Sequence, residues 1–128
     1  MMTPENLRYS KEHEWVQVKK DIAIIGITYY AQKELGELVY VELPEVGGQV
    51  EQMQECGVVE SVKTVSNIYS PVTGEVIAIN ENAIDTPDII NDSPYENGWL
   101  MKVKIEDEGE IDDLMTAEEY DAYLEEKG

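Results

Sequence analysis

The sequence predicts a mainly β (α+β) fold, a β-sandwich or flattened barrel with short helices and a helix near the C-terminal end. Three observations indicate this. Short runs rich in Val and Ile alternate with turns that contain Gly or Pro. Two similar strand–turn–strand units occupy the middle of the chain, one after "PEVG" (residues 44–47) and one after "PVTG" (residues 71–74). The stretch "TAEEYDAYLEE" has the signature of a helix.

The first half of the chain is predicted to contain strands and one short helix. "EWVQVKKDIAIIGI" is typical of two strands around a polar turn. Thr28 can cap a helix over "YYAQKEL", which Gly36 ends. "LVYVEL" is typical of a strand with two distinct faces. Its alternation predicts Val39, Val41 and Leu43 on one face, and Leu38, Tyr40 and Glu42 on the other.

In the second half, "ECGVVES", "EVIAIN" and "GWLMKVKI" are predicted to be strands, and "TPDIIND" allows a short helical turn. Thr116 and Glu119 form a capping box at the start of the closing helix. Eleven acids and one lysine follow from residue 106 onward, which indicates a solvated face. We expect one domain over residues 1–128, with a core at about 8–105 and an acidic helical segment at about 106–128.

The charge of the chain limits its partners. Its 128 residues include nine Lys and Arg against 28 Asp and Glu, a net charge of -19. Such a surface repels nucleic acids and anionic membranes, and it attracts a protein with a basic patch. No apolar run is long enough to span a bilayer, and the N-terminal residues resemble no targeting signal. We expect a cytoplasmic bacterial or archaeal monomer.

Two side chains could support nucleophilic catalysis, but their settings argue against it. Cys56, the only cysteine, lies in an apolar strand and is expected to be an inert core thiol. His13, the only histidine, is expected to be partly buried with a structural hydrogen bond. No motif for a metal or a phosphate group is present. The sequence therefore predicts neither a catalytic residue nor a metal site.

Lys63 occupies an unusual position for a lysine. It lies between the two strand–turn–strand units, at the predicted tip of a hairpin, with β-branched Val62 and Thr64 on either side. Of the eight lysines, we expect only Lys63 to have a hairpin context. An exposed amine on stiff flanks is what a covalent carrier offers to a modifying enzyme. The simpler alternative is an ordinary exposed charge.

The chain resembles the H protein of the glycine cleavage system over nearly its whole length. The resemblance rests on "YSKEHEWV", "IGIT", "AQKELGELVYVELPEVG", "GVVESVK", "IYSPVTGEV", "NDSPYENGWL" and a closing "AEEY" helix. It implies a lipoyl/biotinyl-type barrel-sandwich hybrid of two antiparallel sheets. It also implies a lipoyl group on Lys63 and a carrier that is not itself an enzyme.

The same resemblance implies a set of partners. A pyridoxal-phosphate glycine decarboxylase loads an aminomethyl group onto the lipoamide arm, and a tetrahydrofolate-dependent aminomethyltransferase removes it. Dihydrolipoyl dehydrogenase reoxidises the arm, and a lipoate ligase or a lipoyl/octanoyl transferase attaches it.

The resemblance also suggests roles for residues near the arm. Glu60 and Ser61, just before the tip, are candidates for recognition by the ligase or a partner; ordinary hairpin polarity is the alternative. The loaded arm folds into a cleft near "HEW", where Glu14 would face its amine and His13 would lie close by. Otherwise Glu14 is a surface carboxylate. Asn67 replaces an aspartate that most relatives carry, and so weakens the charge attraction for the amine.

Two other carrier classes fit the sequence less well, and two further classes of protein remain as alternatives. A lipoyl domain of a 2-oxoacid dehydrogenase is shorter and lacks the "SPYENGWL" region. A biotin carrier usually has methionines beside its lysine. An H-like lipoate relay or a lipoate-binding protein of sulfur metabolism would share the lysine hairpin. An unmodified acidic adaptor would bind a basic partner by charge alone, without need of Lys63.

Overall fold

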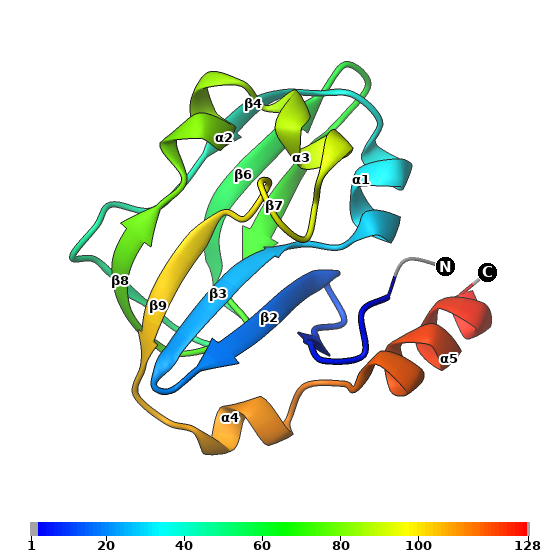
Figure 1. Ribbon diagram of the computed structural model, residues 1–128. Coiled ribbons are helices and arrows are strands. Elements are labelled where there is room, and N and C mark those ends of the chain that lie inside the picture. The colour runs from blue at the N-terminus through cyan, green and yellow to red at the C-terminus, as the bar shows by residue number, and fades with distance from the viewer. Residues whose placement is uncertain (1–2, 128) are drawn as a thin grey trace.

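Two antiparallel β-sheets pack against each other in the computed structural model, which describes residues 3–127 (Figure 1). The larger sheet has six strands in the order β1-β2-β3-β9-β8-β5, and the smaller has three in the order β4-β6-β7. The sheets are not closed into a barrel. The predicted mainly β fold of two antiparallel sheets, with short helices and a C-terminal helix, is confirmed.

The strands are short. They are β1 (Arg8–Tyr9), β2 (Glu14–Lys19), β3 (Ile22–Ile27), β4 (Leu38–Glu42), β5 (Gln49–Val50), β6 (Glu55–Ser61), β7 (Val65–Tyr69), β8 (Gly74–Ile79) and β9 (Met101–Ile105). The helices are α1 (Tyr29–Leu35), α2 (Glu81–Asp85), α3 (Asp88–Asp92), α4 (Gly109–Asp112) and α5 (Ala117–Lys127). The sequence signals did not predict β1, β5, α2 or α4. Among the described residues, no helix is long and apolar enough to cross a membrane.

Local capping signals were read correctly. The Thr28 side chain accepts a hydrogen bond from the Ala31 N–H at 3.2 Å, and Gly36 ends α1 with a φ of 88°. At the start of α5, the Thr116 N–H donates to Glu119 Oε1 at 2.8 Å, and the Glu119 N–H donates to Thr116 Oγ1 at 3.2 Å. The predicted capping box is therefore confirmed.

The alternation predicted for residues 38–43 was wrong in its first half. Leu38 is 2% exposed, whereas Val39 is 48% exposed. The pairing of β4 with β6 shifts register between Leu38 and Tyr40, as at a β-bulge. Because a bulge adds one residue to the strand, it reverses the face on which the preceding side chains lie. Leu38 and Val41 therefore both point into the core.

The two turns of the internal repeat lie side by side. The Gly47 N–H donates to the Val76 carbonyl at 2.7 Å, and the Val76 N–H donates to the Gly48 carbonyl at 2.9 Å. Strand β5, which follows the first turn, pairs with β8, which begins at the end of the second. The repeat thus supplies one edge of the larger sheet.

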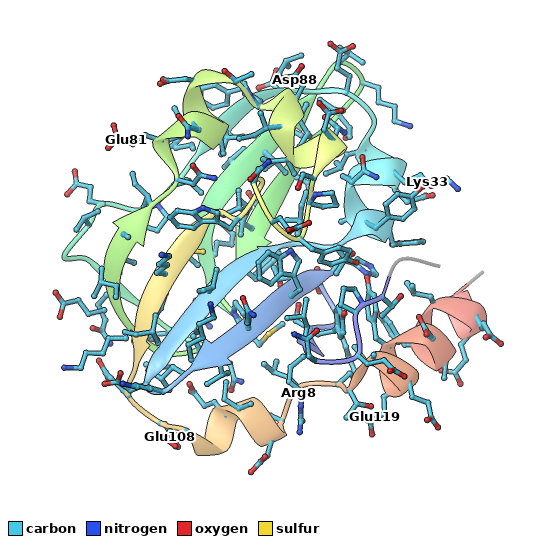
Figure 2. The ribbon with its side chains drawn as sticks, in the orientation of Figure 1. Arg8, Lys33, Glu81, Asp88, Glu108 and Glu119 are labelled. Carbon is cyan, nitrogen blue, oxygen red and sulfur yellow. The ribbon has the colours of Figure 1, made fainter. Side chains whose placement is uncertain are left out.

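The acidic C-terminal segment covers one end of this framework (Figure 1). Helix α5 buries Ala117, Tyr120 and Leu124 in an aromatic cluster with Tyr9 and Trp15. Most acids of the segment are exposed, as Figure 2 shows for Glu108 and Glu119. The segment is therefore amphipathic, with a solvated acidic face and an apolar face that docks against β1 and β2.

Candidate functional site

Lys63 lies in the turn between β6 and β7, and it is exposed. Its neighbour Val62 is 69% exposed, and Val65, where β7 begins, is 60% exposed. The turn is closed by Ser61, whose N–H donates to the Thr64 carbonyl at 2.8 Å. The Ser61 hydroxyl oxygen accepts from the Lys63 N–H at 3.2 Å and from the Thr64 N–H at 3.1 Å. The lysine is thus presented on a short, internally bonded tip.

The tip is also joined to the end of α1. The Val62 N–H donates to the Glu37 carbonyl oxygen at 3.1 Å. A Cβ built on Gly36 would lie 3.6 Å from Lys63 Cε. The aliphatic stem of Lys63 therefore passes close to the residue that ends α1, and a side chain at position 36 would contact it.

The outer face of the three-stranded sheet leads up to this tip. Tyr40, Glu60 and Val65 are cross-strand neighbours in one row. Strands β4, β6 and β7 contain no Lys or Arg. The charge of Glu42 raises the pKa of Tyr40, whose hydroxyl donates to Glu42 Oε1 at 3.2 Å. The face thus combines exposed apolar side chains with uncompensated negative charge.

Ser61 and Glu60 differ in what they offer to a partner. Ser61 is 4% exposed, and its hydroxyl is engaged in closing the turn. Glu60 is half-buried on the outer face, between Tyr40 and Val65. A partner can contact Glu60 directly, but it meets Ser61 only through the shape of the tip.

Glu14 is a buried residue, so the alternative of a surface carboxylate is wrong. It is 1% exposed, because it lies in β2 where the two sheets meet. Its carboxylate accepts hydrogen bonds from the Ser10 hydroxyl and from the Tyr69 N–H, the latter at 3.2 Å. Burial raises the pKa of Glu14 to about 8. The carboxyl group is therefore mostly neutral at neutral pH.

The three residues predicted to form the cleft hydrogen-bond to different partners. Glu14 bonds to Ser10 and Tyr69, as above. His13 is half-buried, with Nδ1 at 2.8 Å from the Tyr120 hydroxyl. Asn67 is exposed, and its amide donates to Glu55 Oε1 at 3.2 Å. The predicted structural hydrogen bond of His13 is confirmed.

A cavity near the "HEW" segment lies beside Trp15. Its volume is about 580 Å³, and its lining includes Trp15, Tyr95, Trp99 and Lys102. Glu14, His13 and Asn67 do not line it. The cavity therefore does not bring the predicted cleft residues together.

In the described part of the chain, neither Cys56 nor the acidic side chains form a reactive arrangement. Cys56 packs between the apolar clusters of the two sheets, and burial raises the pKa of its thiol to about 12. A thiol with so high a pKa forms little thiolate. Within residues 3–127, no group of three or more His, Cys, Asp or Glu is placed to hold a metal ion.

Several residues that hold the site were missed by the sequence reasoning. Tyr95 accepts from the Tyr29 N–H at 3.0 Å, and the Trp15 indole donates to the Pro94 carbonyl at 2.9 Å. Asn91 bonds to the segment that follows α1. Asn91, Pro94 and Tyr95 all lie in "NDSPYENGWL", a stretch that supports the resemblance but had no predicted physical role. Its concentration of Asn, Pro and Tyr ahead of the predicted strand "GWLMKVKI" was the available signal.

The chain is similar to known proteins along nearly its whole length. Residues 7–127 match the family described as "Glycine cleavage H-protein". The glycine cleavage system H protein of Staphylococcus carnosus is 55% identical over 120 residues, which cover 94% of this chain and 95% of that one. The one from Halothermothrix orenii is 52% identical over 126 residues, 98% of each chain.

A solved structure is similar as well. The crystal structure of a glycine cleavage system H protein from Mycobacterium marinum superposes with a TM-score of 0.89 at 37% identity. The match covers 94% of this chain and 98% of that one.

Proposed function

From the premise that the chain belongs to the glycine cleavage H-protein family, and is thus a lipoyl carrier of the glycine cleavage system, we propose that the lipoyl group is attached to Lys63 Nζ. The observation that carries this proposal is the exposed, internally bonded tip on which Lys63 lies. A modifying enzyme can reach the amine there and can recognise one shape. The test is peptide mapping after treatment with a lipoate ligase.

The hairpin context alone does not single out Lys63. Lys20 is exposed in the turn between β2 and β3, so the expectation that only Lys63 lies in a hairpin was wrong. The two turns differ in construction. Lys20 has a φ of 59°, whereas the tip around Lys63 is closed by the Ser61 hydroxyl and joined to Glu37. We propose that the ligase recognises this construction rather than a lysine in a turn.

The residues around Lys63 fit a long covalent arm. Amide formation removes the positive charge of the lysine, and the exposed tip leaves the arm free to reach several enzymes in turn. When attached, the dithiolane supplies the sulfur chemistry that takes up and releases an aminomethyl group. Tethering keeps the group at an effective concentration on the order of millimolar beside its carrier. The chain itself then binds and presents, and we propose that it catalyses no step.

The partners follow from the place of the family in the glycine cleavage system. We propose that the chain is loaded by the pyridoxal-phosphate glycine decarboxylase and unloaded by the aminomethyltransferase, and that dihydrolipoyl dehydrogenase reoxidises the arm. The acidic and apolar outer face beside Lys63 supports contact with a partner surface that carries Lys or Arg around an apolar centre. We propose a monomeric carrier, which sedimentation would test.

A protective role of Glu14 toward the loaded arm would require local movement. The carboxyl group is 1% exposed, so an amine carried by the arm reaches it only if the chain around Ser10 or Tyr69 opens. An arriving cation would favour the charged carboxylate and lower its pKa. The test compares the lifetime of the loaded arm in Glu14→Gln with that in the wild type. An unchanged lifetime would leave Glu14 with its structural role alone.

A further inference from the structure

Helix α1 is held at its N-terminal end by two tyrosines from distant parts of the chain. The hydroxyl groups of Thr28 and Tyr120 lie 2.8 Å apart, and the Tyr29 N–H donates to the Tyr95 hydroxyl at 3.0 Å. A helix of seven residues is not stable on its own, so its position depends on such contacts. In Figure 1, α1 and the segment that follows it lie between α5 and the turn that joins β6 and β7.

The other end of α1 is held by Asn91, which lies on α3 and is half-buried. Asn91 Oδ1 accepts from the Leu38 N–H at 3.0 Å. Asn91 Nδ2 donates to the Gly36 carbonyl at 2.8 Å and to Gln32 Oε1 at 3.0 Å. The carboxamide of Asn91 thus accepts from the N–H of residue 38 and donates to oxygens of residues 36 and 32. Neither a carboxylate nor a hydroxyl group of similar size can make all three bonds.

Residue 37 is the one that holds the lysine hairpin. Its carbonyl oxygen accepts from the Val62 N–H at 3.1 Å, one residue before Lys63. Leu38 is the cross-strand partner of Ser61, the residue that closes the tip. Gly36 borders the stem of Lys63. The segment fixed by Asn91 therefore contacts the tip through Glu37 and Leu38, and Gly36 lies beside the stem of Lys63.

We propose that Asn91 is a positioning residue, which fixes residues 36–38 so that the hairpin presents Lys63 in one orientation to the enzyme that modifies it. The tip is otherwise exposed on both sides of the lysine, at Val62 and Val65. Without the carboxamide, the carbonyl of Glu37 is no longer held in place, and the tip samples more orientations. The proposal rests on Lys63 as the attachment site.

The test measures the hairpin directly. Amide hydrogen exchange is followed at Val62, which donates to Glu37, and at Leu100, which is fully buried and donates to the Ile25 carbonyl at 2.8 Å. The variants are Asn91→Ala and Asn91→Asp; aspartate keeps the acceptor for Leu38 and loses both donors. Asn82→Ala and Asn82→Asp are the matched controls, because Asn82 is an exposed asparagine on the neighbouring helix α2.

We expect exchange at Val62 to become about tenfold faster in both Asn91 variants, with exchange at Leu100 unchanged. With a lipoate ligase, the KM for the variant chain rises by a similar factor and kcat stays close to that of the wild type. The population of the recognised shape falls, but the amine is unaltered once it is bound. The Asn82 variants behave as the wild type in both measurements.

Two results would overturn the proposal, and a third would show that only the attachment site is wrong. Unchanged exchange at Val62 in the Asn91 variants overturns it. Equal acceleration at Val62 and Leu100 also overturns it, because Asn91 then stabilises the whole fold rather than the hairpin. If the wild-type chain is not lipoylated at Lys63, the attachment site is wrong, and the exchange measurement alone still decides whether Asn91 holds the hairpin.

Discussion

The carboxyl group of Glu14 in β2 accepts a hydrogen bond from the backbone N–H of Tyr69 in β7, at 3.2 Å, and so connects the two sheets. The connection is made at a point where Glu14 is 1% exposed. Both oxygens of Glu14 accept there, Oε1 from the Ser10 hydroxyl and Oε2 from the Tyr69 N–H, and neither partner carries a positive charge. The charged form loses hydration without gaining a cationic partner, which is why burial raises its pKa to about 8.

Stability is expected to depend on the protonation of Glu14. The raised pKa means that the folded chain holds the proton more tightly than the unfolded chain, whose pKa lies near the ordinary value of 4.5. The contribution of Glu14 is therefore fully present below about 4.5 and is lost as the pH rises through about 8. We expect the free energy of unfolding of the wild type to fall over this window by more than that of Glu14→Gln.

Urea unfolding of the two chains across the window is the measurement. Gln has nearly the shape of the neutral acid and cannot ionise, so Glu14→Gln serves as a permanently uncharged reference. The difference between the two curves isolates the effect of the ionisable group at position 14. Parallel curves for the two chains would show that Glu14 keeps its charge in the folded state.

Gly74 is expected to be indispensable to the pairing of β8 with β9. A Cβ at this position would lie 1.9 Å from the Lys104 carbonyl oxygen, a backbone atom that cannot give way without separating the strands. We expect Gly74→Ala to lower the free energy of unfolding by about 3 kcal/mol or more. Gly47→Ala is the comparison: nothing lies within 4 Å of its Cβ, and its φ of 93° costs about 1 kcal/mol. Equal losses in urea unfolding would contradict the steric argument.

What the sequence predicted well is local. The cap of α1 at Thr28 and the capping box at Thr116 and Glu119 each depend on residues three positions apart, and both are present. The lysine hairpin followed from the place of Lys63 between the two strand–turn–strand units. The surroundings of Glu14 did not follow, because its second partner is 55 residues away. The same holds for Asn91, whose three partners lie 53 to 59 residues away.

The bulge in β4 shows the limit of pattern reasoning. Val39 and Val41 alternate as in a regular strand, so the pattern predicts that both lie on the same face. Pairing with β6 decides otherwise, because the register shifts between Leu38 and Tyr40. The consequence matters for the site. Val39 and Tyr40, each 48% exposed, remain available to a partner beside the lysine hairpin.

Binding of the glycine decarboxylase is expected to depend on charge at the outer face of the small sheet. Glu42 is exposed there, on a sheet whose strands contain no cation. We expect Glu42→Lys to lower the association rate constant by about threefold or more at low salt. Added salt should slow association of the wild type and should have less effect on the variant.

Glu118→Lys is the matched control for this effect. It makes the same change of charge on an exposed residue of α5, away from the small sheet. Stopped-flow or surface-binding measurements at two salt concentrations compare the three chains. Equal slowing in both variants would mean that the net charge of -19 steers the partner without regard to the face.

Lipoylation is expected to occur at Lys63 and to spare Lys20. Both lysines are exposed in hairpin turns, but only the turn at Lys63 is closed by a buried serine and joined to a neighbouring segment. Lys63→Arg should therefore gain no mass after treatment with a lipoate ligase, whereas Lys20→Arg should gain one lipoyl group, as the wild type does. Both variants should melt at the wild-type temperature, since an exposed side chain at a turn adds little to the core. A lipoyl group on Lys63→Arg would show that the ligase accepts another lysine and that the built tip is not what it recognises.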